Sequence, residues 1–270
     1  MRSDKCFDAS CAEYGRTAET LAHNTVDFHS HILPGMDDGA TDVGTSLTML
    51  ETAFKQGIRA MVATSHFYAD RESPESFLER RDAAVKALIE GGYAPGKLHP
   101  HIYLGAEVAF FSGMSASPRL SSLCIGGGKG ILVEMPFERW TDNVISEVLA
   151  IRDALGLRPI IAHIERYISY QKSSSLGRLI EGGAIIQSNA EYFTEKKTSK
   201  KAVKLLLRGG IHLLGSDAHG LTERVPNLGE GIGVIAKHKF GEQLMVDIVE
   251  CSRYVLKHAK PVEAVEVAPV

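Results

Sequence analysis

The segment "VDFHSHILPGMDDG", residues 26–39, predicts a buried strand followed by a polar turn. His29 and His31 lie two positions apart, and on a strand such residues point to the same side because successive side chains alternate. Asp37 and Asp38 follow a few residues later, in the predicted turn. Two imidazoles and two carboxylates so close together indicate either a polar outer face or a bound cation.

The overall composition is that of an ordinary globular protein, with 270 residues, 44% hydrophobic and 23% charged. A net charge of −3 argues against a nucleic-acid partner, because nucleic-acid-binding domains are usually basic. The four cysteines, Cys6, Cys11, Cys124 and Cys251, are scattered, and this indicates a reducing compartment. Since there is no secretory signal and no apolar run of about 18 residues, we expect a cytoplasmic protein without membrane insertion.

Strands and helices alternate along the chain from Thr25 onward. The apolar runs predict strands at residues 25–31, 58–66, 101–108, 130–135, 158–165, 184–190 and 211–219. Helical periodicity, together with caps such as Ser73 and Pro74, predicts helices at residues 41–57, 73–92, 141–156, 175–183, 199–210 and 242–259.

This alternation favours a parallel α/β fold in one domain, since no linker-like stretch divides the units. Several strands are continuously apolar, as expected when helices cover the sheet. About seven strand–helix units predict a barrel, and an open doubly wound sheet is the competing architecture. Residues 1–24 lack a strong period, so we interpret them as a partly helical N-terminal extension and residues 25–270 as the domain.

Metal-binding residue types stand at the ends of the predicted strands. They are His29, His31, Asp38, His66, Glu107, Glu134, His163, Asp217 and His219. In an α/β barrel the carboxyl ends of all strands open onto one face, where active sites are built. Imidazole and carboxylate ligands suit manganese, iron or zinc, and nine of them exceed what one ion uses. The pattern therefore predicts two or three divalent ions in one pocket.

Other histidines fail this positional test. His99 and His101 begin a predicted strand whose far end carries Glu107, about 20 Å away at the usual rise per residue, so we expect them to be solvated loop residues. His212 precedes Asp217 by five residues and is excluded in the same way.

His163 and Glu134 have structural alternatives. His163 alone would be interpreted as a hydrogen-bonded core histidine. A buried, unpartnered Glu134 carboxylate costs several kcal/mol, so Glu134 needs a cation or a partner. A metal cluster accounts for all of these residues at once, whereas a structural explanation has to be found for each one separately.

Two arginines, Arg166 and Arg224, follow the candidate ligands closely. Guanidinium is the preferred group for binding an oxyanion such as phosphate, although each arginine could instead pair with its neighbour, Glu165 or Glu223. Beside several cations, which lower the pKa of a bound water, the arginines indicate phosphate-ester hydrolysis. The glycine-rich run at 124–130 fits neither a cysteine phosphatase nor a Walker loop, and predicts a turn.

The motifs "DFHSHILPGMDDG", "TSH", "GAE", "VEM", "IAHIERY" and "SDAH", in this order, resemble the PHP (polymerase and histidinol phosphatase) superfamily. They are most similar to its bacterial manganese-dependent tyrosine phosphatases of the CpsB/YwqE type, over about residues 25–260. The first and fifth motifs are specific to that branch, whereas the ligand order is common to the superfamily. The resemblance implies a distorted (β/α)7 TIM-like barrel, a trinuclear manganese centre, and phosphotyrosine in the tail of a bacterial tyrosine autokinase as substrate.

The resemblance also implies a role for each site residue. The first ion is expected on His29, His31, Glu107 and Asp217. The second ion is expected on Glu107, Glu134 and His163, with Glu107 bridging. The third ion is expected on Asp38, His66 and His219. Arg166 and Arg224 correspond to phosphate-binding arginines. The extension at residues 1–24 and the Met after Glu134 depart from the family pattern, which leaves oligomer contacts and substrate fit open.

From the sequence we therefore expect a metal-dependent protein tyrosine phosphatase that controls capsule or exopolysaccharide synthesis, with no general acid identified. Three alternatives stay open. One is a small-molecule phosphatase of the histidinol phosphatase kind, and a second is a metal-dependent amidohydrolase, against which the two arginines argue. The third is a catalytically silent regulatory barrel, although such a module should have lost ligands.

Overall fold

The computed structural model describes residues 18–263. Cys6 and Cys11 lie outside the described residues. The strands are β1 Val26–Ser30, β2 Ala60–Ala63, β3 His66–Phe67, β4 His101–Leu104, β5 Glu107–Ala109, β6 Gly130–Glu134, β7 Arg158–Ile161, β8 Ile185–Asn189 and β9 Leu213–Gly215. The helices are α1 Ala18–Asn24, α2 Val43–Lys55, α3 Pro74–Glu90, α4 Asp142–Leu155, α5 Ser173–Glu181, α6 Glu191–Thr194, α7 Ser199–Leu207, α8 Leu228–Ala236 and α9 Gly241–Leu256.

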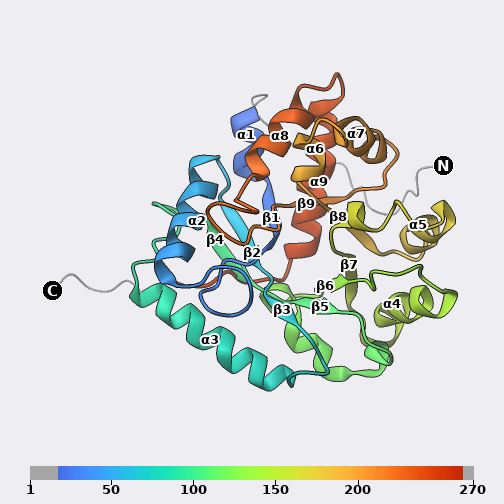
Figure 1. Ribbon diagram of the computed structural model, residues 1–270, viewed down its shortest axis with the longest axis horizontal. Helices are drawn as coiled ribbons and strands as arrows, with labels where there is room; N and C mark the ends of the chain where they lie inside the picture. The colour runs from blue at the N-terminus through green and yellow to red at the C-terminus, as the bar shows by residue number, and fades with distance from the viewer. Residues whose placement is uncertain (1–17, 264–270) are drawn as a thin grey trace.

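The strands form two parallel sheets, in the orders β1-β2-β4 and β3-β5-β6-β7-β8-β9. Two predicted strands are each broken, the first into β2 and β3 and the second into β4 and β5, so the strands of the described residues fill seven positions. Backbone bonds join the first and last positions, because His31 N donates to Ala218 O (2.9 Å) and Asp217 N donates to His29 O (2.7 Å). The predicted distorted (β/α)7 barrel is confirmed, with α2, α3, α4, α5 and α7 around the strands (Figure 1).

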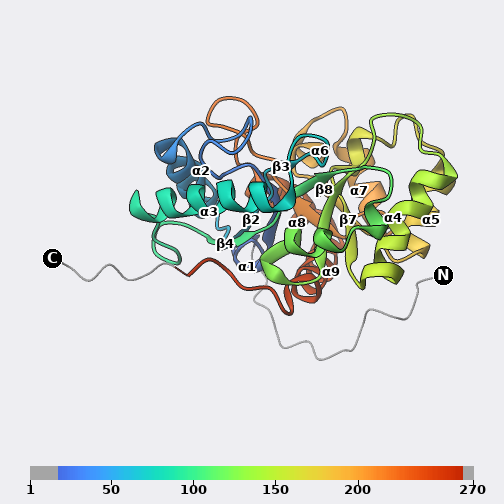
Figure 2. The same cartoon turned by 90° about the horizontal axis from the view of Figure 1, so that it is seen from below.

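Helix α9 covers the amino ends of the central strands. A Cβ atom at Gly130, the first residue of β6, would lie only 2.8 Å from Val255 of α9. The Arg158 guanidinium, at the start of β7, lies 4.0 Å from the ring centre of Tyr254. Figure 2 shows α9 on one side of the strands and the loop after β9 on the other. The carboxyl ends are therefore the side left for a functional site.

The helix boundaries follow the predicted caps closely. Ser73 accepts a hydrogen bond from Ser76 N at the start of α3, with Pro74 in its first turn. Thr141 caps α4 in the same way, and Gly156 ends that helix with a φ of 67°, which favours glycine. Helices α6 and α8 were not predicted from the sequence. The first has only four residues, and the second carries three glycines in "LGEGIGVIA", which weaken its helical signal.

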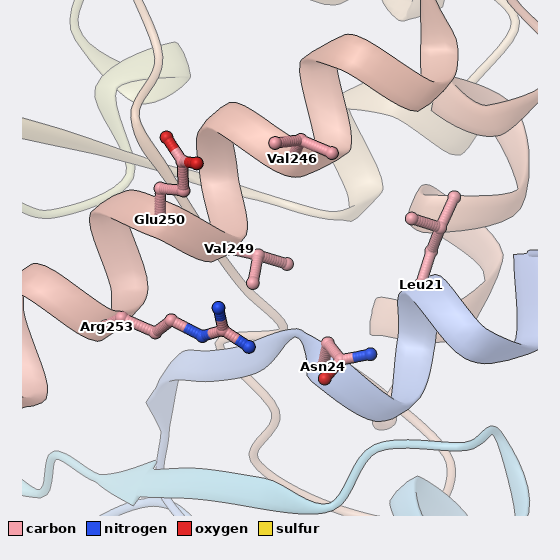
Figure 3. Close-up of a pocket in the computed structure, with 6 residues that line it drawn as sticks. All are labelled: Leu21, Asn24, Val246, Val249, Glu250 and Arg253. Carbon is pink, nitrogen blue, oxygen red and sulfur yellow. The ribbon is translucent and has the colours of Figure 1, made fainter. Parts of the chain in front are cut away.

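The last part of the predicted N-terminal extension is helical, as expected, and packs against the domain. Helix α1 lies against α8 and α9. Leu21 and Asn24 of α1 line a small, mainly apolar pocket together with Val246, Val249, Glu250 and Arg253 of α9 (Figure 3). Because only Thr25 separates Asn24 from β1, this pocket lies near the amino ends of the strands, on the side away from the candidate ligands.

The expectation for His99 is wrong. This residue is only 3% exposed, its Nδ1 accepts a hydrogen bond from Ala94 N (2.9 Å), and its ring lies 5.8 Å from that of Tyr93. His99 therefore closes the loop before β4 instead of facing solvent. His101 is exposed, as expected. Within the described residues, we find no helix with the length and apolar character needed to cross a bilayer.

His212 gives the fold a measurable dependence on pH. Its Nδ1 accepts a hydrogen bond from Ile186 N (3.0 Å), and burial lowers its pKa from 6.5 to about 4. A histidine with a depressed pKa is protonated more readily in the unfolded chain, so stability falls as pH drops from 6.5 towards 4. We expect His212→Asn to lose less stability than wild type between pH 7 and pH 5, by up to about 2 kcal/mol.

Urea unfolding at the two pH values measures this difference. His101→Asn, which replaces an exposed histidine, is the matched control and should follow wild type. Other titrating groups are shared by the three proteins and cancel in the comparison. The same loss of stability in wild type and His212→Asn would contradict the prediction.

Candidate metal centre

The nine candidate ligands come together at the carboxyl side of the barrel. His29 lies on β1 and His31 just after it, His66 begins β3, Glu107 begins β5 and Glu134 ends β6. His163, Asp217 and His219 follow β7 and β9, and Asp38 lies in the turn after β1. Three groups of donor atoms have mutual separations that could hold an ion: His31, Asp38, His66 and His219; His29, His31 and Glu107; and His66, Glu107 and Glu134.

The most buried part of the cluster contains His29, His31, Glu107 and Asp217, all 2% exposed or less. His29 Nε2 lies 3.2 Å from His31 Nε2, 3.2 Å from Glu107 Oε2 and 3.3 Å from Asp217 Oδ1. His31 Nε2 lies 3.4 and 3.5 Å from the same two oxygens. Donor atoms that share one cation at about 2.0–2.2 Å lie roughly this far apart. His29, His31 and Glu107 therefore form one group of donors that could hold an ion, and Asp217 lies within reach of its two imidazoles.

Glu107 has the position of a bridging ligand. Its Oε1 lies 2.8 Å from His163 Nε2, while its Oε2 lies 3.0 Å from His66 Nδ1 and 3.2 Å from His29 Nε2. Burial raises the pKa of Glu107, but the charge of His29 and the hydrogen bonds from the histidines outweigh it and hold the pKa well below its usual value. Glu107 is thus a carboxylate with each oxygen turned to a different group of imidazoles.

The outer members of the cluster complete the arrangement. Asp38 Oδ1 lies 3.4 Å from His66 Nε2 and 3.4 Å from His219 Nε2, and His163 Nε2 lies 3.5 Å from Glu134 Oε1. The buried His66 Nδ1 and His219 Nε2 make no hydrogen bond with the described residues. Leaving buried polar atoms unsatisfied costs about 1–3 kcal/mol each. A cation shared by His219 Nε2, His66 Nε2 and Asp38 Oδ1 accounts for the orientation of His219. His66 Nδ1 is instead turned towards Glu107 Oε2.

Asp37 orients the histidines, a role that the sequence did not reveal. Asp37 Oδ2 accepts hydrogen bonds from His31 Nδ1 (2.8 Å) and from His66 N (2.8 Å). Burial raises the Asp37 pKa, but the bond and charge of His31 outweigh it, so the pKa lies below its usual value. Because Nδ1 of His31 is occupied, Nε2 faces the cluster. Such outer contacts fix the direction of metal-binding imidazoles.

Strand β8 supplies no candidate ligand but supports several of them. Gln187 Oε1 lies 3.3 Å from His29 Nδ1 and accepts a bond from His163 N (2.7 Å). Its amide donates to Asn189 (3.0 Å), whose own amide donates to Asp217 (2.9 Å). These polar side chains were visible in the sequence, in "AIIQSNA" at the end of a strand. Their supporting role could not be predicted from the sequence, because the search for metal ligands considered imidazoles and carboxylates and not amides.

The backbone is strained at three of the site residues. His163, Asp217 and Arg224 have φ values of 28°, 52° and 47°, and they are the non-glycine residues with positive φ in the described part of the chain. Such conformations cost about 1–3 kcal/mol each and persist only where the surroundings enforce them. The contacts around the site therefore hold these three residues in a conformation that they would rarely adopt otherwise.

Both arginines reach the cluster. Arg166 pairs with one oxygen of Asp217 and Arg224 with the other. Neither of them pairs with its neighbouring glutamate. Glu165 is half-buried and accepts hydrogen bonds from Ser188 Oγ (2.9 Å) and from Asn189 N (3.2 Å). The Arg166 and Arg224 side chains are 35% and 36% exposed, so each can bind a ligand from solvent while it remains beside the candidate metal centre.

Comparisons with known proteins agree with this geometry. Residues 25–256 match the family model described as capsular polysaccharide synthesis, CpsB/CapC. Tyrosine-protein phosphatase CpsB of Streptococcus agalactiae serotype III is 29% identical over 247 residues, covering 86% of this chain and 98% of that protein. Tyrosine-protein phosphatase YwqE of Bacillus subtilis is 30% identical over 244 residues, covering 86% and 92%.

A solved structure is also similar. It is one of the crystal structures of YwqE from Bacillus subtilis and CpsB from Streptococcus pneumoniae, which are metal-dependent tyrosine phosphatases. The match has a TM-score of 0.74 with 28% identity, and it covers 88% of this chain and 100% of the other. The resemblance inferred from the motifs is confirmed by these matches.

The contacts of Gln187 predict an effect on metal affinity. We expect Gln187→Leu to bind Mn²⁺ about 10- to 100-fold more weakly, because the orientation of His29 is lost when the amide is removed. Isothermal titration calorimetry of the metal-free protein measures the affinity directly. Gln243→Leu removes an exposed amide on α9 and should bind as wild type does. Equal affinity of the two variants would refute the orienting role.

Proposed function

The chain belongs to the CpsB/CapC family of capsular polysaccharide synthesis, and from that premise we propose that it is a metal-dependent protein tyrosine phosphatase. The observation that carries the proposal is the gathering of nine imidazole and carboxylate side chains in one cluster of adjoining groups, with two arginines beside them. The tyrosine-phosphatase names of its relatives support the substrate class. The substrate that we propose is phosphotyrosine on a bacterial tyrosine autokinase that controls capsule or exopolysaccharide synthesis.

We assign the metal ligands as the nine residues of the cluster. His29, His31, Glu107 and Asp217 would hold one ion, and Glu107 would bridge to a second, held also by Glu134 and His163. Asp38, His66 and His219 would hold a third. Manganese suits this mixture of nitrogen and oxygen donors, as do iron and zinc. When bound, such ions lower the pKa of a water molecule and neutralise phosphoryl oxygens.

The two arginines bind the phosphoryl group in this proposal. Each guanidinium offers paired N–H donors that match phosphate oxygens, and each stands beside Asp217 with about a third of its side chain exposed. Arg166 and Arg224 would hold the non-bridging oxygens and stabilise charge that develops there. A tyrosine phenolate, with a pKa of about 10, leaves without a strong general acid.

The extent and the location of the enzyme also belong to this proposal. The family match begins at residue 25, which supports an extension at residues 1–24 and a phosphatase domain at residues 25–270. The scattered cysteines favour the cytoplasm. A silent regulatory barrel is disfavoured because all nine expected ligands are present and lie together.

Site variants distinguish ligand loss from loss of phosphate binding. We expect His31→Ala to abolish hydrolysis of a phosphotyrosine peptide, because the most buried donor group loses a ligand. Arg166→Ala should lower kcat/KM by roughly 10²- to 10³-fold, the usual effect of removing one group that stabilises transition-state charge. Steady-state kinetics with added Mn²⁺ measures both, and Arg119→Ala, which removes an exposed arginine paired with Glu75, is the control.

The choice of substrate tests the proposal itself. Turnover of histidinol phosphate without turnover of the phosphotyrosine peptide would reassign the protein as a small-molecule phosphatase. Full activity of His31→Ala would remove the metal centre from the reaction.

Metal removal gives an independent test. We expect dialysis against EDTA to abolish hydrolysis and added Mn²⁺ to restore it in wild type but not in His31→Ala, because the chelator removes the ions that activate water. Elemental analysis should give two to three ions per chain after reconstitution. Unchanged hydrolysis in protein shown to be free of metal would contradict the mechanism.

A further inference from the structure

Phe137 is an exposed phenyl side chain beside the candidate metal centre. It is 58% exposed, and it lies three residues after Glu134, which ends β6. Single exposed apolar side chains are common on protein surfaces, so exposure alone means little. The position is what distinguishes Phe137. In the described residues, the other exposed Phe, Phe240, packs beside His238 and under Lys239 at the start of α9.

The Phe137 ring is held by a support of aromatic side chains. Its centre lies 5.1 Å from that of Tyr167, which is completely buried, and Tyr167 in turn lies 5.2 Å from Trp140. Trp140 Nε1 also donates a hydrogen bond (3.0 Å) to the carbonyl oxygen of Pro136, and Pro136 immediately precedes Phe137. One side of the ring therefore packs on buried aromatic side chains, while more than half of the residue remains accessible to solvent.

The same ring lies against a candidate ligand. Its centre is 6.0 Å from that of His163, with an angle of 26° between the two planes. His163 Nε2 lies 2.8 Å from the candidate bridging carboxylate, Glu107. Phe137 is thus separated from the cluster by one imidazole. The accessible part of its ring borders the place where a substrate bound at the cluster would extend outward.

The chemistry of an aryl phosphate fits this position. Only one oxygen atom separates the phosphorus of such an ester from its aromatic ring, so the ring lies immediately outside the metal centre when the phosphoryl group is bound. Aromatic rings prefer offset or edge-on contact with one another, and such contacts add to the effect of simple burial. An alkyl ester presents no ring at this position and makes no such contact.

We propose that Phe137 is a specificity-determining residue that binds the aromatic ring of aryl phosphate monoesters and favours them over alkyl esters. This inference rests on the proposed phosphatase function. It identifies the residue that would distinguish phosphotyrosine from phosphoserine. The metal ligands and the arginines cannot make this distinction, because in the proposed function they act only on the phosphoryl group. Phe137 supplies ring contact and takes no part in proton transfer.

The test compares two esters on matched variants. We expect Phe137→Leu to lower kcat/KM for phenyl phosphate about 3- to 10-fold, mainly through KM, as loss of one aromatic pair predicts. Turnover of ethyl phosphate should stay within twofold. Phe137→Tyr keeps the ring and should restore the aryl preference. Phe240→Leu, which replaces the other exposed Phe, should leave both esters unaffected.

Inhibitor binding separates recognition from chemistry. Phenylphosphonate should inhibit Phe137→Leu about 3- to 10-fold more weakly than wild type, while inhibition by inorganic phosphate is unchanged. If Phe137→Leu lowers turnover of both esters equally, or of neither, the proposal is overturned while the phosphatase function stands. If wild type with Mn²⁺ hydrolyses neither ester, the proposed function itself fails, and this inference falls with it.

Discussion

The buried carboxylate of Glu107 is the constraint around which the structure is arranged. It is 1% exposed, and placing such a charge away from water costs many kcal/mol unless positive charge surrounds it. Imidazoles from β1, β3 and the end of β7 approach its two oxygens. These contacts join strands β1, β3, β5 and the segment after β7 at one point. The same carboxylate relates the separate groups of candidate ligands to one another.

The interruptions in two strands leave the pairing between those strands unchanged. His66 and Glu107 begin β3 and β5, the second halves of the broken strands, and these two residues are partners in the register of that pair. Before the breaks the same two strands pair with the same offset, as in Ala60 with His101 and Ala63 with Leu104. The register that continues across both breaks thus places an imidazole and a carboxylate side by side at the open end.

The rule that strand ends gather on one face was enough to select eight of the nine candidate ligands from the sequence, because it depends only on where strands stop. The ninth, Asp38, was taken from the turn that follows His29 and His31. The roles of neighbouring residues could not be predicted in this way. Asp37 and Asp38 are adjacent, yet the turn directs the first to His31 Nδ1 and the second outward to His66 and His219. The pairing of both arginines with Asp217 depends on long-range contacts. The burial of His99 depends on the closure of a loop, and loops show no periodic pattern in the sequence from which such a closure could be predicted.

Closure of the barrel between β1 and β9 has a consequence for how the protein is made. His29 and His31 are synthesised well before Asp217 and Ala218, whose backbone groups hydrogen-bond to them. Helix α9, which covers the amino ends of the strands, follows β9 in the chain and is synthesised later still. Contacts between such distant parts of a chain form slowly, because a long loop must first close. The centre is therefore complete only after residues up to His219 have emerged from the ribosome, and a shorter nascent chain cannot offer a metal ion the full set of candidate ligands.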